Sequence, residues 1–242
     1  MAQKDDKPKG GLHNGHRMRL RKKYFEQGID SFEAHEVLEL LLFYGIPRRD
    51  TNETAHELIN RFGSLAGVFD ADLKELESVN GVGRHAAGLL KLIPELSRLY
   101  ISDVIGYNDT LNSTVKAGNF ILPRFIGYTD ERLMVVSLDG KSRVIGCDVI
   151  AVGTVNEVAL SVRTVVEIAM KNKAVGVILA HNHPGGVAVP SNTDIETTWQ
   201  IFNALSMVNV CLLDHIVVAG NEFVSMRESK KSKNIFKIND GI

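Results

Sequence analysis

The stretch "AVGVILAHNHPGGVAVPSNTD", Ala174 to Asp194, joins an apolar run to a group of polar side chains. The run before His181 is continuous and rich in branched aliphatic residues, which is typical of a buried strand. Side chains two residues apart in a strand point to the same side, so His181 and His183 can direct both imidazoles to one point. The Pro-Ser pair further on predicts a helix with Asp194 in its first turn.

These three polar side chains form a candidate metal site. Two imidazoles and one carboxylate can hold a divalent metal such as zinc and leave a fourth tetrahedral position open for water, which is the pattern of a catalytic site. Gly185 and Gly186 allow the backbone between the strand and the helix to turn tightly. We therefore predict His181, His183 and Asp194 as metal ligands.

Two simpler interpretations of the same residues stay open. A histidine pair at a strand end can be merely solvated or hydrogen bonded. The sequence "SNTD" also fits a helix start in which Ser191 is the N-cap and Asp194 closes a variant of the capping box. The combination of the histidine pair, the glycines and the Pro-Ser-x-x-Asp spacing is less expected by chance than any part of it, and it favours the metal site.

The residues around this stretch predict a mixed sheet with packed helices. Upstream, "ERLMVVSLDG" and "SRVIGCDVIAVG" are β-branched runs with an Asp139-Gly140 turn signal between them, which predicts a hairpin. The remaining periodic segments predict helices over 113–127, 157–171 and 192–207 and strands over 210–220 and 222–226.

The first part of the chain has a different pattern. From Gly15 to about Leu99 the apolar residues recur at helical spacing, with glycine and proline at the breaks. We therefore predict an α/β (α+β) protein with two domains, an all-helical one over 1–106 and a mixed-sheet one over 107–242. The segment "YISDVIGYNDTLN" is the expected linker.

Charge and cysteine content limit the function less than the motifs do. The chain has 28 Lys and Arg against 29 Asp and Glu, but Met1 to Lys23 carries eight basic residues against Asp5 and Asp6. This arm suits either a phosphate contact or a solvated tail. Cys147 and Cys211 lie in apolar runs, which predicts buried free thiols in a reducing compartment.

The chain also gives an expectation about its location. No signal peptide is evident, and no apolar run reaches the roughly 18 residues needed to span a bilayer. We therefore expect a cytoplasmic protein without a membrane partner.

The segment "HNHPGGVAVPSNTD" resembles the HxHP...PSxxD signature of JAMM (JAB1/MPN+) metalloproteases, and the half of the chain around it resembles the bacterial RadC family. The resemblance extends over essentially the whole chain through "HRMRLRKKY", "HEVLELLLFYGIPRRDT", "RFGSLAGVF" and "LLDHIVV". RadC proteins carry a helix-hairpin-helix, to which "LESVNGVGRHAAGLL" is similar. The resemblance implies a JAB/MPN-like sheet domain. One departure is Gly185, where RadC sequences usually have serine.

The resemblance also implies a reaction and a set of roles. One zinc ion per chain, held by the three predicted ligands, would activate water to hydrolyse a peptide or isopeptide bond in a peptide or protein substrate. In JAMM enzymes a glutamate ahead of the first hairpin strand is the general base, and the order of elements points to Glu131, with Asp130 as the competing carboxylate. A plain surface charge is the simpler interpretation of Glu131. Ser191 would donate a hydrogen bond to the oxyanion.

Asp214 and His215 are adjacent in a predicted strand, so they face opposite ways. One of them can support a ligand histidine. We expect a hydrogen-bonded structural pair instead.

The glycines of "VNGVGRHAAGLL" suggest a phosphate-binding site away from the metal site. The N–H groups of Gly81 and Gly83, with Arg84 beside them at the start of a helix, can cradle a phosphate oxygen. The helix-hairpin-helix resemblance implies DNA contact without sequence preference. A glycine turn also joins two helices without any ligand.

Three functions follow in order of preference. The first is a zinc-dependent JAMM-type hydrolase recruited to DNA or to a protein. The second is a DNA-associated binding or adaptor module, linked to DNA repair, whose metal site is structural or relic. A metal-dependent nuclease is third, because nucleases usually hold metals with carboxylates. The sequence does not set the oligomeric state.

Overall fold

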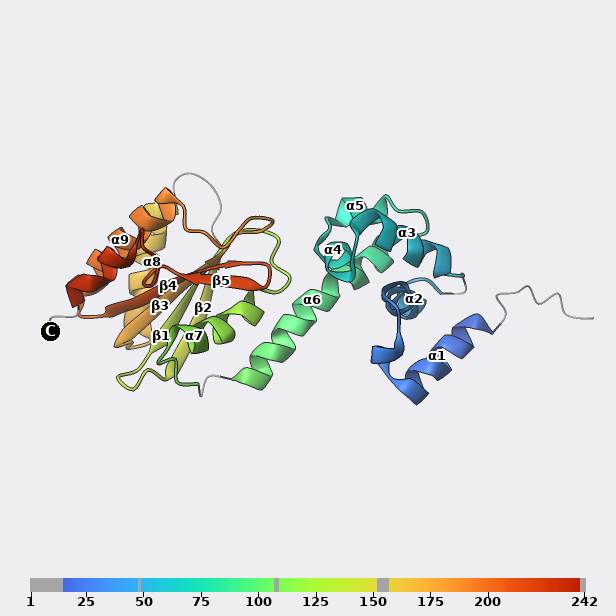
Figure 1. Ribbon diagram of the computed structural model, residues 1–242, viewed down its shortest axis with the longest axis horizontal. Coiled ribbons are helices and arrows are strands. Elements are labelled where there is room, and N and C mark those ends of the chain that lie inside the picture. Colours follow the sequence, from blue (N-terminus) through green and yellow to red (C-terminus); the bar gives the residue numbers. More distant parts are fainter. Residues whose placement is uncertain (1–14, 48, 107–108, 152–156, 240–242) are drawn as a thin grey trace, which may run out of the picture. The chain divides into compact units, whose positions relative to one another are not determined.

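The computed structural model describes residues 15–47, 49–106, 109–151 and 157–239. Helices come first along the chain and a mixed sheet with its own helices follows, which confirms the predicted fold class (Figure 1). The chain divides into two compact units, Met1–Pro94 and Glu95–Ile242. The division falls inside helix α6 (Arg84–Ile105), whereas the sequence places it after Gly106.

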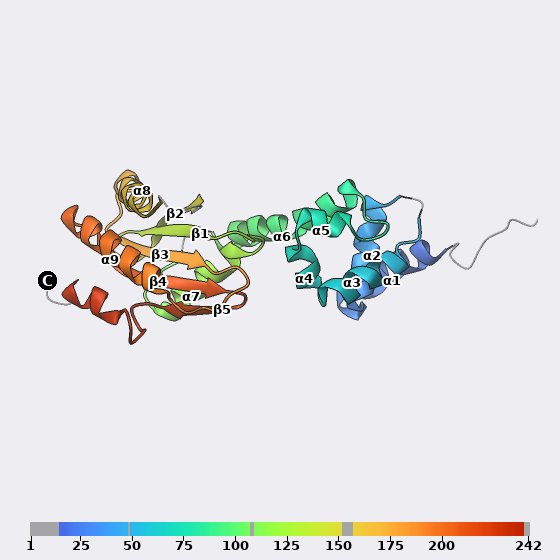
Figure 2. The same cartoon turned by 90° about the horizontal axis from the view of Figure 1, so that it is seen from above.

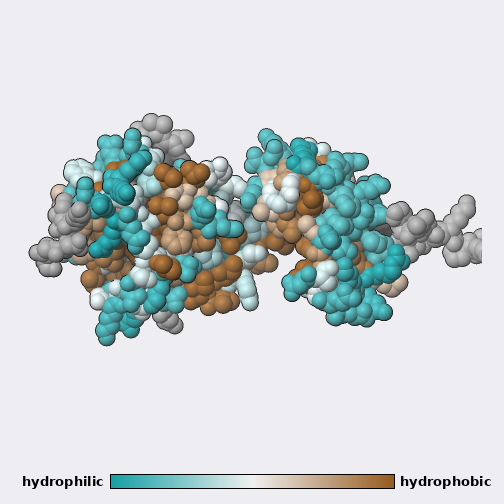
Figure 3. Space-filling view, viewed as in Figure 1, coloured by the Kyte–Doolittle hydropathy of each residue, from teal (hydrophilic) through white to brown (hydrophobic). Residues whose placement is uncertain are grey.

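The first unit is built from short helices around a main apolar core and a smaller cluster of Leu20, Leu40 and Phe43. On the face shown in Figure 3, hydrophilic residues cover most of this unit. Its fully buried leucines come from successive helices and are Leu38, Leu42, Leu58, Leu76 and Leu90. The elements are α1 (His16–Gln27), η1 (Ile29–Ser31), α2 (Ala34–Gly45), α3 (Asn52–Phe62), α4 (Leu65–Asp70), α5 (Leu73–Glu77) and the first part of α6.

Two basic residues of α1 pack on α2. The guanidinium of Arg17 lies 4.6 Å from the centre of the Phe43 ring, and Lys23 Nζ lies 2.9 and 2.7 Å from the carboxylate oxygens of Glu36. From Gly15 onward the basic segment is therefore a packed helix and not a solvated tail. The earlier part of the predicted arm lies outside the described residues.

The two glycines before α6 have different surroundings. Gly81 has a φ of +85°, and a Cβ there would lie 2.7 Å from Thr54 Oγ1. Gly83 has open space where a Cβ would be, and the next residue, Arg84, is exposed. The fold therefore requires glycine at position 81 and tolerates a side chain at position 83. Helix-hairpin-helix character and DNA contact at this turn stay predictions.

We expect Gly81→Ala to destabilise the protein by about 1–3 kcal/mol, because alanine must adopt a left-handed backbone conformation and Thr54 must move. Gly83→Ala is the matched control and is expected to change the free energy of unfolding by less than about 0.5 kcal/mol. Urea denaturation measures both values. Equal destabilisation by the two variants would contradict this account.

The second unit is a five-stranded sheet in the order β2-β1-β3-β4-β5. Only β3 and β4 run parallel; the other neighbouring pairs are antiparallel. The Asp139-Gly140 turn joins β1 and β2, as predicted. Hydrogen bonds from Arg143 lower the pKa of Asp139 to about 2. The strands are β1 (Arg132–Leu138), β2 (Val144–Ala151), β3 (Gly176–Asn182), β4 (Cys211–Ala219) and β5 (Glu222–Ser225).

Helices cover both faces of this sheet. Helices α8 (Glu157–Lys171) and α9 (Asn192–Met207) lie on one face, and α7 (Thr114–Ile121), followed by η2 (Leu122–Phe125), lies on the other (Figure 2). The last element is η3 (Lys233–Asn239).

The alternation of side chains along β3 decides where its histidine points. Val177 and Leu179 belong to the core under α8 and α9, whereas Ile178 and Ala180 belong to the core over α7. His181 therefore points to the α9 face.

The two cysteines differ in exposure. Both are free thiols, as predicted, but Cys211 is exposed because it begins β4 at the rim of the sheet, so the expectation that it is buried was wrong. Cys147 is half-buried, and burial raises the pKa of its thiol to about 11.

We expect iodoacetamide at pH 8 to modify Cys211 quickly and Cys147 slowly, because only about a thousandth of a thiol with a pKa near 11 is thiolate at that pH. The alkylation rate of Cys147 should rise as the pH approaches 11. Mass spectrometry of tryptic peptides measures both rates, and Cys211→Ser should remove only the fast reaction. Equal rates for the two thiols would be incompatible with the structure.

Among the described residues, none of the helices has the length and the apolar character of a membrane span.

Candidate metal centre

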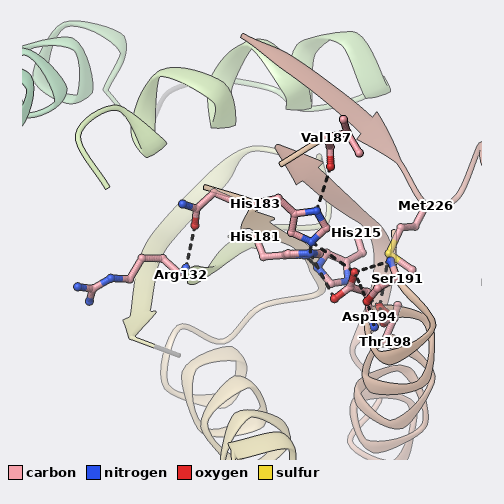
Figure 4. Close-up of polar contacts among 10 residues, drawn as sticks. Arg132, His181, His183, Val187, Ser191, Asp194, Thr198, His215 and Met226 are labelled. Carbon is pink, nitrogen blue, oxygen red and sulfur yellow. Dashed lines mark hydrogen bonds and ion pairs between the residues drawn. The ribbon is translucent and has the colours of Figure 1, made fainter. Parts of the chain in front are cut away.

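The structure brings the three predicted ligands together at the rim of the sheet. His181 is buried near the end of β3, and His183 follows the strand directly. Their Nε2 atoms lie 2.9 Å apart. The carboxylate of Asp194 faces both, with Oδ1 3.4 Å from His181 Nε2 and Oδ2 3.5 Å from His183 Nε2 (Figure 4). Donor atoms around a tetrahedral zinc ion are separated by about 3.3 Å, so this spacing fits a metal ion.

Glu131 completes the group. It directly precedes β1, whose antiparallel pairing with β3 places Leu133 opposite His181. One ligand atom from each of Glu131, His181, His183 and Asp194 lies within 4.8 Å of all the others. Residues from the start of β1, the end of β3 and the start of α9 therefore converge on one point.

The competing carboxylate has another partner. Asp130 is exposed, and its Oδ2 lies 2.5 Å from Arg132 Nη2. Of the two neighbouring acidic residues, only Glu131 belongs to the group around the histidines.

A backbone carbonyl sets the tautomer of His183. Its Nδ1 lies 3.0 Å from the oxygen of Val187 (Figure 4). A carbonyl oxygen only accepts hydrogen bonds, so Nδ1 carries a proton; in the neutral form of the ring, Nε2 then has a lone pair, and it faces the carboxylate of Asp194. This is the state that a metal ligand requires.

A longer hydrogen-bond chain sets the tautomer of His181. Thr198 Oγ1 donates to the backbone oxygen of Asp194 at 2.5 Å, so His215 Nδ1, 2.6 Å away, must donate to Thr198. His215 is buried, and burial lowers its pKa well below the usual value, so its ring is neutral and Nε2 accepts. His181 Nδ1, at 2.8 Å, is therefore the donor, which leaves His181 Nε2 for a metal.

Sequence interpretation gave His215 only as one of two residues that could support a ligand histidine, preferred a structural role for it, and did not name Thr198. His215 faces His181, whereas Asp214 faces Ser225 Oγ, which donates to it at 2.6 Å. The expectation of a structural pair therefore describes Asp214 and not His215. The parallel pairing of β3 with β4, which puts His215 opposite Leu179, is the feature that brings it to the site.

Asp194 is both a helix cap and a neighbour of the histidines. Its Oδ2 accepts hydrogen bonds from the backbone N and from Oγ of Ser191, each at 2.7 Å, and its own N donates to Ser191 Oγ. Burial alone would raise the pKa of Asp194, but the two hydrogen bonds from Ser191 oppose it, and the pKa stays below the usual value. The carboxylate is therefore ionised at neutral pH. The cap and the metal-ligand interpretations are compatible.

The same contacts bear on the predicted role of Ser191. Its hydroxyl proton is directed at Asp194 Oδ2. Donation to an oxyanion would require the hydroxyl to rotate away from Asp194, so this role stays a prediction.

A surface cavity of ≈ 420 Å³ adjoins the site. Val187, whose carbonyl holds His183, lines it together with Val189 of the same loop and Phe223 of β5. In this loop Gly185 has a φ of +67° and open space beside it.

Comparison with known proteins finds a family match in each of the two units. The RadC-like JAB domain model matches residues 111–231, and the UPF0758 N-terminal model matches residues 15–88. A UPF0758 protein of Fusobacterium nucleatum is 36% identical over 235 residues, which cover 94% of this chain and 98% of the relative. A UPF0758 protein of Cupriavidus necator is 32% identical over 210 residues, with coverages of 87% and 92%.

Proposed function

Because the chain belongs to the RadC-like, UPF0758 family, we propose that it is a zinc-dependent hydrolase of the JAMM type that cleaves a peptide or isopeptide bond in the cytoplasm. The observation that carries the proposal is the convergence of Glu131, His181, His183 and Asp194 on one point. Imidazole suits zinc, whereas carboxylate and carbonyl oxygens suit magnesium or calcium, so two histidines in the group favour zinc.

His181, His183 and Asp194 would hold the metal ion, since their hydrogen bonds leave two imidazole lone pairs and an ionised carboxylate directed to one point. When bound, zinc polarises the scissile carbonyl and lowers the pKa of its water to about 7. Glu131 would accept a proton from the attacking water and return it to the leaving amine. Ser191 would then stabilise the oxyanion after its hydroxyl turns from Asp194.

The cavity beside the site supports a peptide substrate. Val187, Val189 and Phe223 offer apolar surface to a side chain next to the scissile bond, and Val187 connects this surface to His183.

DNA contact by the first unit is a separate proposal. It is supported by the open space at Gly83 and by the exposed Arg84 at the start of α6. Gly83→Leu should weaken salt-sensitive binding to a random duplex without unfolding the protein. A protein that binds no duplex at low salt would limit the turn to a scaffold role.

Digestion of a random peptide library by the zinc-loaded protein tests the hydrolase proposal. We expect new peptide termini to appear, to be prevented by 1,10-phenanthroline and to return when zinc is added. Cleavage that is unaffected by the chelator would contradict a metal-dependent reaction. A zinc-loaded protein that cleaves neither the library nor isopeptide-linked peptides would favour the alternative, a DNA-associated adaptor with a structural or relic metal site.

A further inference from the structure

We propose that Asn182 is a positioning residue that fixes Glu131 beside the metal ligands; this inference rests on the function proposed above. Asn182 lies between the two histidines and is buried. Its Nδ2 donates to the backbone oxygen of Asp130 at 2.9 Å, and its Oδ1 accepts from the backbone N of Arg132 at 2.8 Å. The second of these bonds is the dashed line to Arg132 in Figure 4. One side chain therefore holds the backbone on both sides of Glu131.

The pairing of the strands explains why a side chain is needed there. The ladder between β1 and β3 ends at the pair Leu133 and His181. Beyond it, β3 stays with β4, since the backbone N of His183 donates to Val218 at 2.8 Å. The side-chain amide of Asn182 takes the place of a β3 peptide group opposite Glu131. Like a peptide group, it offers a hydrogen-bond acceptor on one side and a donor on the other.

Few other side chains can make both bonds. Aspartate has the same shape as asparagine and can accept from the N–H of Arg132, but it would place a carboxylate oxygen against the carbonyl oxygen of Asp130. Alanine makes neither bond. The N–H and C=O groups that flank Glu131 also set the orientation of the amide, since each can meet only one of its two ends.

Loss of the Asn182 amide should affect the position of Glu131 and not that of the metal ligands. Glu131 is exposed and precedes β1, so the two bonds of Asn182 tie its backbone to β3. His181 and His183 are held independently, by His215 and by the carbonyl of Val187. Loss of the amide should therefore displace the base and spare metal binding. A misplacement of about 1 Å at a reacting centre can cost on the order of 100-fold in rate.

A substrate-free measurement tests the position of Glu131. In Co²⁺-loaded protein with ¹³C-labelled glutamate carboxyls, the Glu131 signal is identified by its absence in Glu131→Gln. Its metal-induced shift depends steeply on the distance to the ion. We expect Asn182→Ala and Asn182→Asp to change this shift strongly and to accelerate hydrogen exchange at the Arg132 amide. An unchanged shift would overturn the inference.

Asn172→Ala is the matched control for Asn182→Ala. Asn172 likewise makes two side-chain hydrogen bonds in the same unit, both as donor, from Nδ2 to Ser137 Oγ at 3.1 Å and to Asp148 Oδ2 at 3.0 Å. Its removal therefore reproduces the loss of an amide away from the site. We expect the shift of Glu131 to remain at the wild-type value in Asn172→Ala. An equal change in both alanine variants would indicate a general loss of structure and overturn the inference.

Library cleavage separates this inference from the proposed function. We expect Asn182→Ala to reduce the rate on the order of 100-fold at full metal content and to have no further effect in the Glu131→Gln background. An additive loss in that background, or loss of metal, would overturn the positioning role. A wild type that binds Co²⁺ but cleaves nothing would refute the hydrolase alone, because the Glu131 shift still decides the role of Asn182.

Discussion

Glu131→Gln is expected to lower the cleavage rate to a small measurable residue and to leave the metal in place. Glutamine keeps the size of glutamate but cannot accept the proton of the attacking water, and removal of a general base costs roughly 10²- to 10⁴-fold in rate. The metal should stay because His181, His183 and Asp194 are positioned by contacts that do not involve Glu131. Zinc content and library cleavage, measured on the same preparation, check the two parts of the prediction.

The neighbouring carboxylate provides the control. Asp130→Asn removes an acidic group one residue away that pairs with Arg132 and does not belong to the group around the histidines. It should retain most of the wild-type rate. Undiminished cleavage by Glu131→Gln, or an equal loss in Asp130→Asn, would show that Glu131 is not the base.

Replacement of both His181 and His183 by alanine is expected to reduce the metal content from about one zinc per chain to none. Each imidazole supplies one ligand atom, and the carboxylate of Asp194 alone binds zinc weakly in water. The same variant should lose the thermal stabilisation that added zinc gives the wild type, because an ion that binds only the folded protein raises its melting temperature. Elemental analysis and thermal scans with and without zinc measure both effects.

The chain contains a matched pair of histidines in the first unit. His35, which is half-buried, and His56, which is exposed, stack with ring centres 4.1 Å apart, on α2 and α3. The double variant His35→Ala, His56→Ala should keep its zinc. Zinc that persists in His181→Ala, His183→Ala and disappears in the control would place the metal site elsewhere.

The sequence was sufficient for elements whose signals are local. The predicted helices 157–171 and 192–207 coincide with α8 and α9. For α9 the reason is the Ser191 cap, which the structure contains. The predicted linker is less accurate, because α6 continues to Ile105 and includes residues that the sequence assigned to the connection. A change in composition does not by itself end a helix.

The same distinction applies to the site. His181, His183 and Asp194 follow from spacing along one strand and the next helix, and Glu131 follows from the order of elements and the family resemblance. The sequence could not decide between Asp214 and His215 or identify Thr198, because these contacts depend on the parallel register of β3 with β4 and on the packing of α9 over the sheet. The role of Asn182 could not be predicted for the same reason, since both of its hydrogen-bond partners lie about 50 residues away in the sequence.

X-ray absorption spectroscopy of the zinc-loaded protein tests the central claim most directly, because it reports the atoms bound to the metal. The structure predicts two imidazole nitrogens at about 2.0–2.1 Å, with the remaining positions filled by oxygen from Asp194 and water. The His181→Ala, His183→Ala variant, which is expected to hold no zinc, should give no zinc absorption signal after the same loading. Sulfur at about 2.3 Å, or an all-oxygen shell, would contradict it.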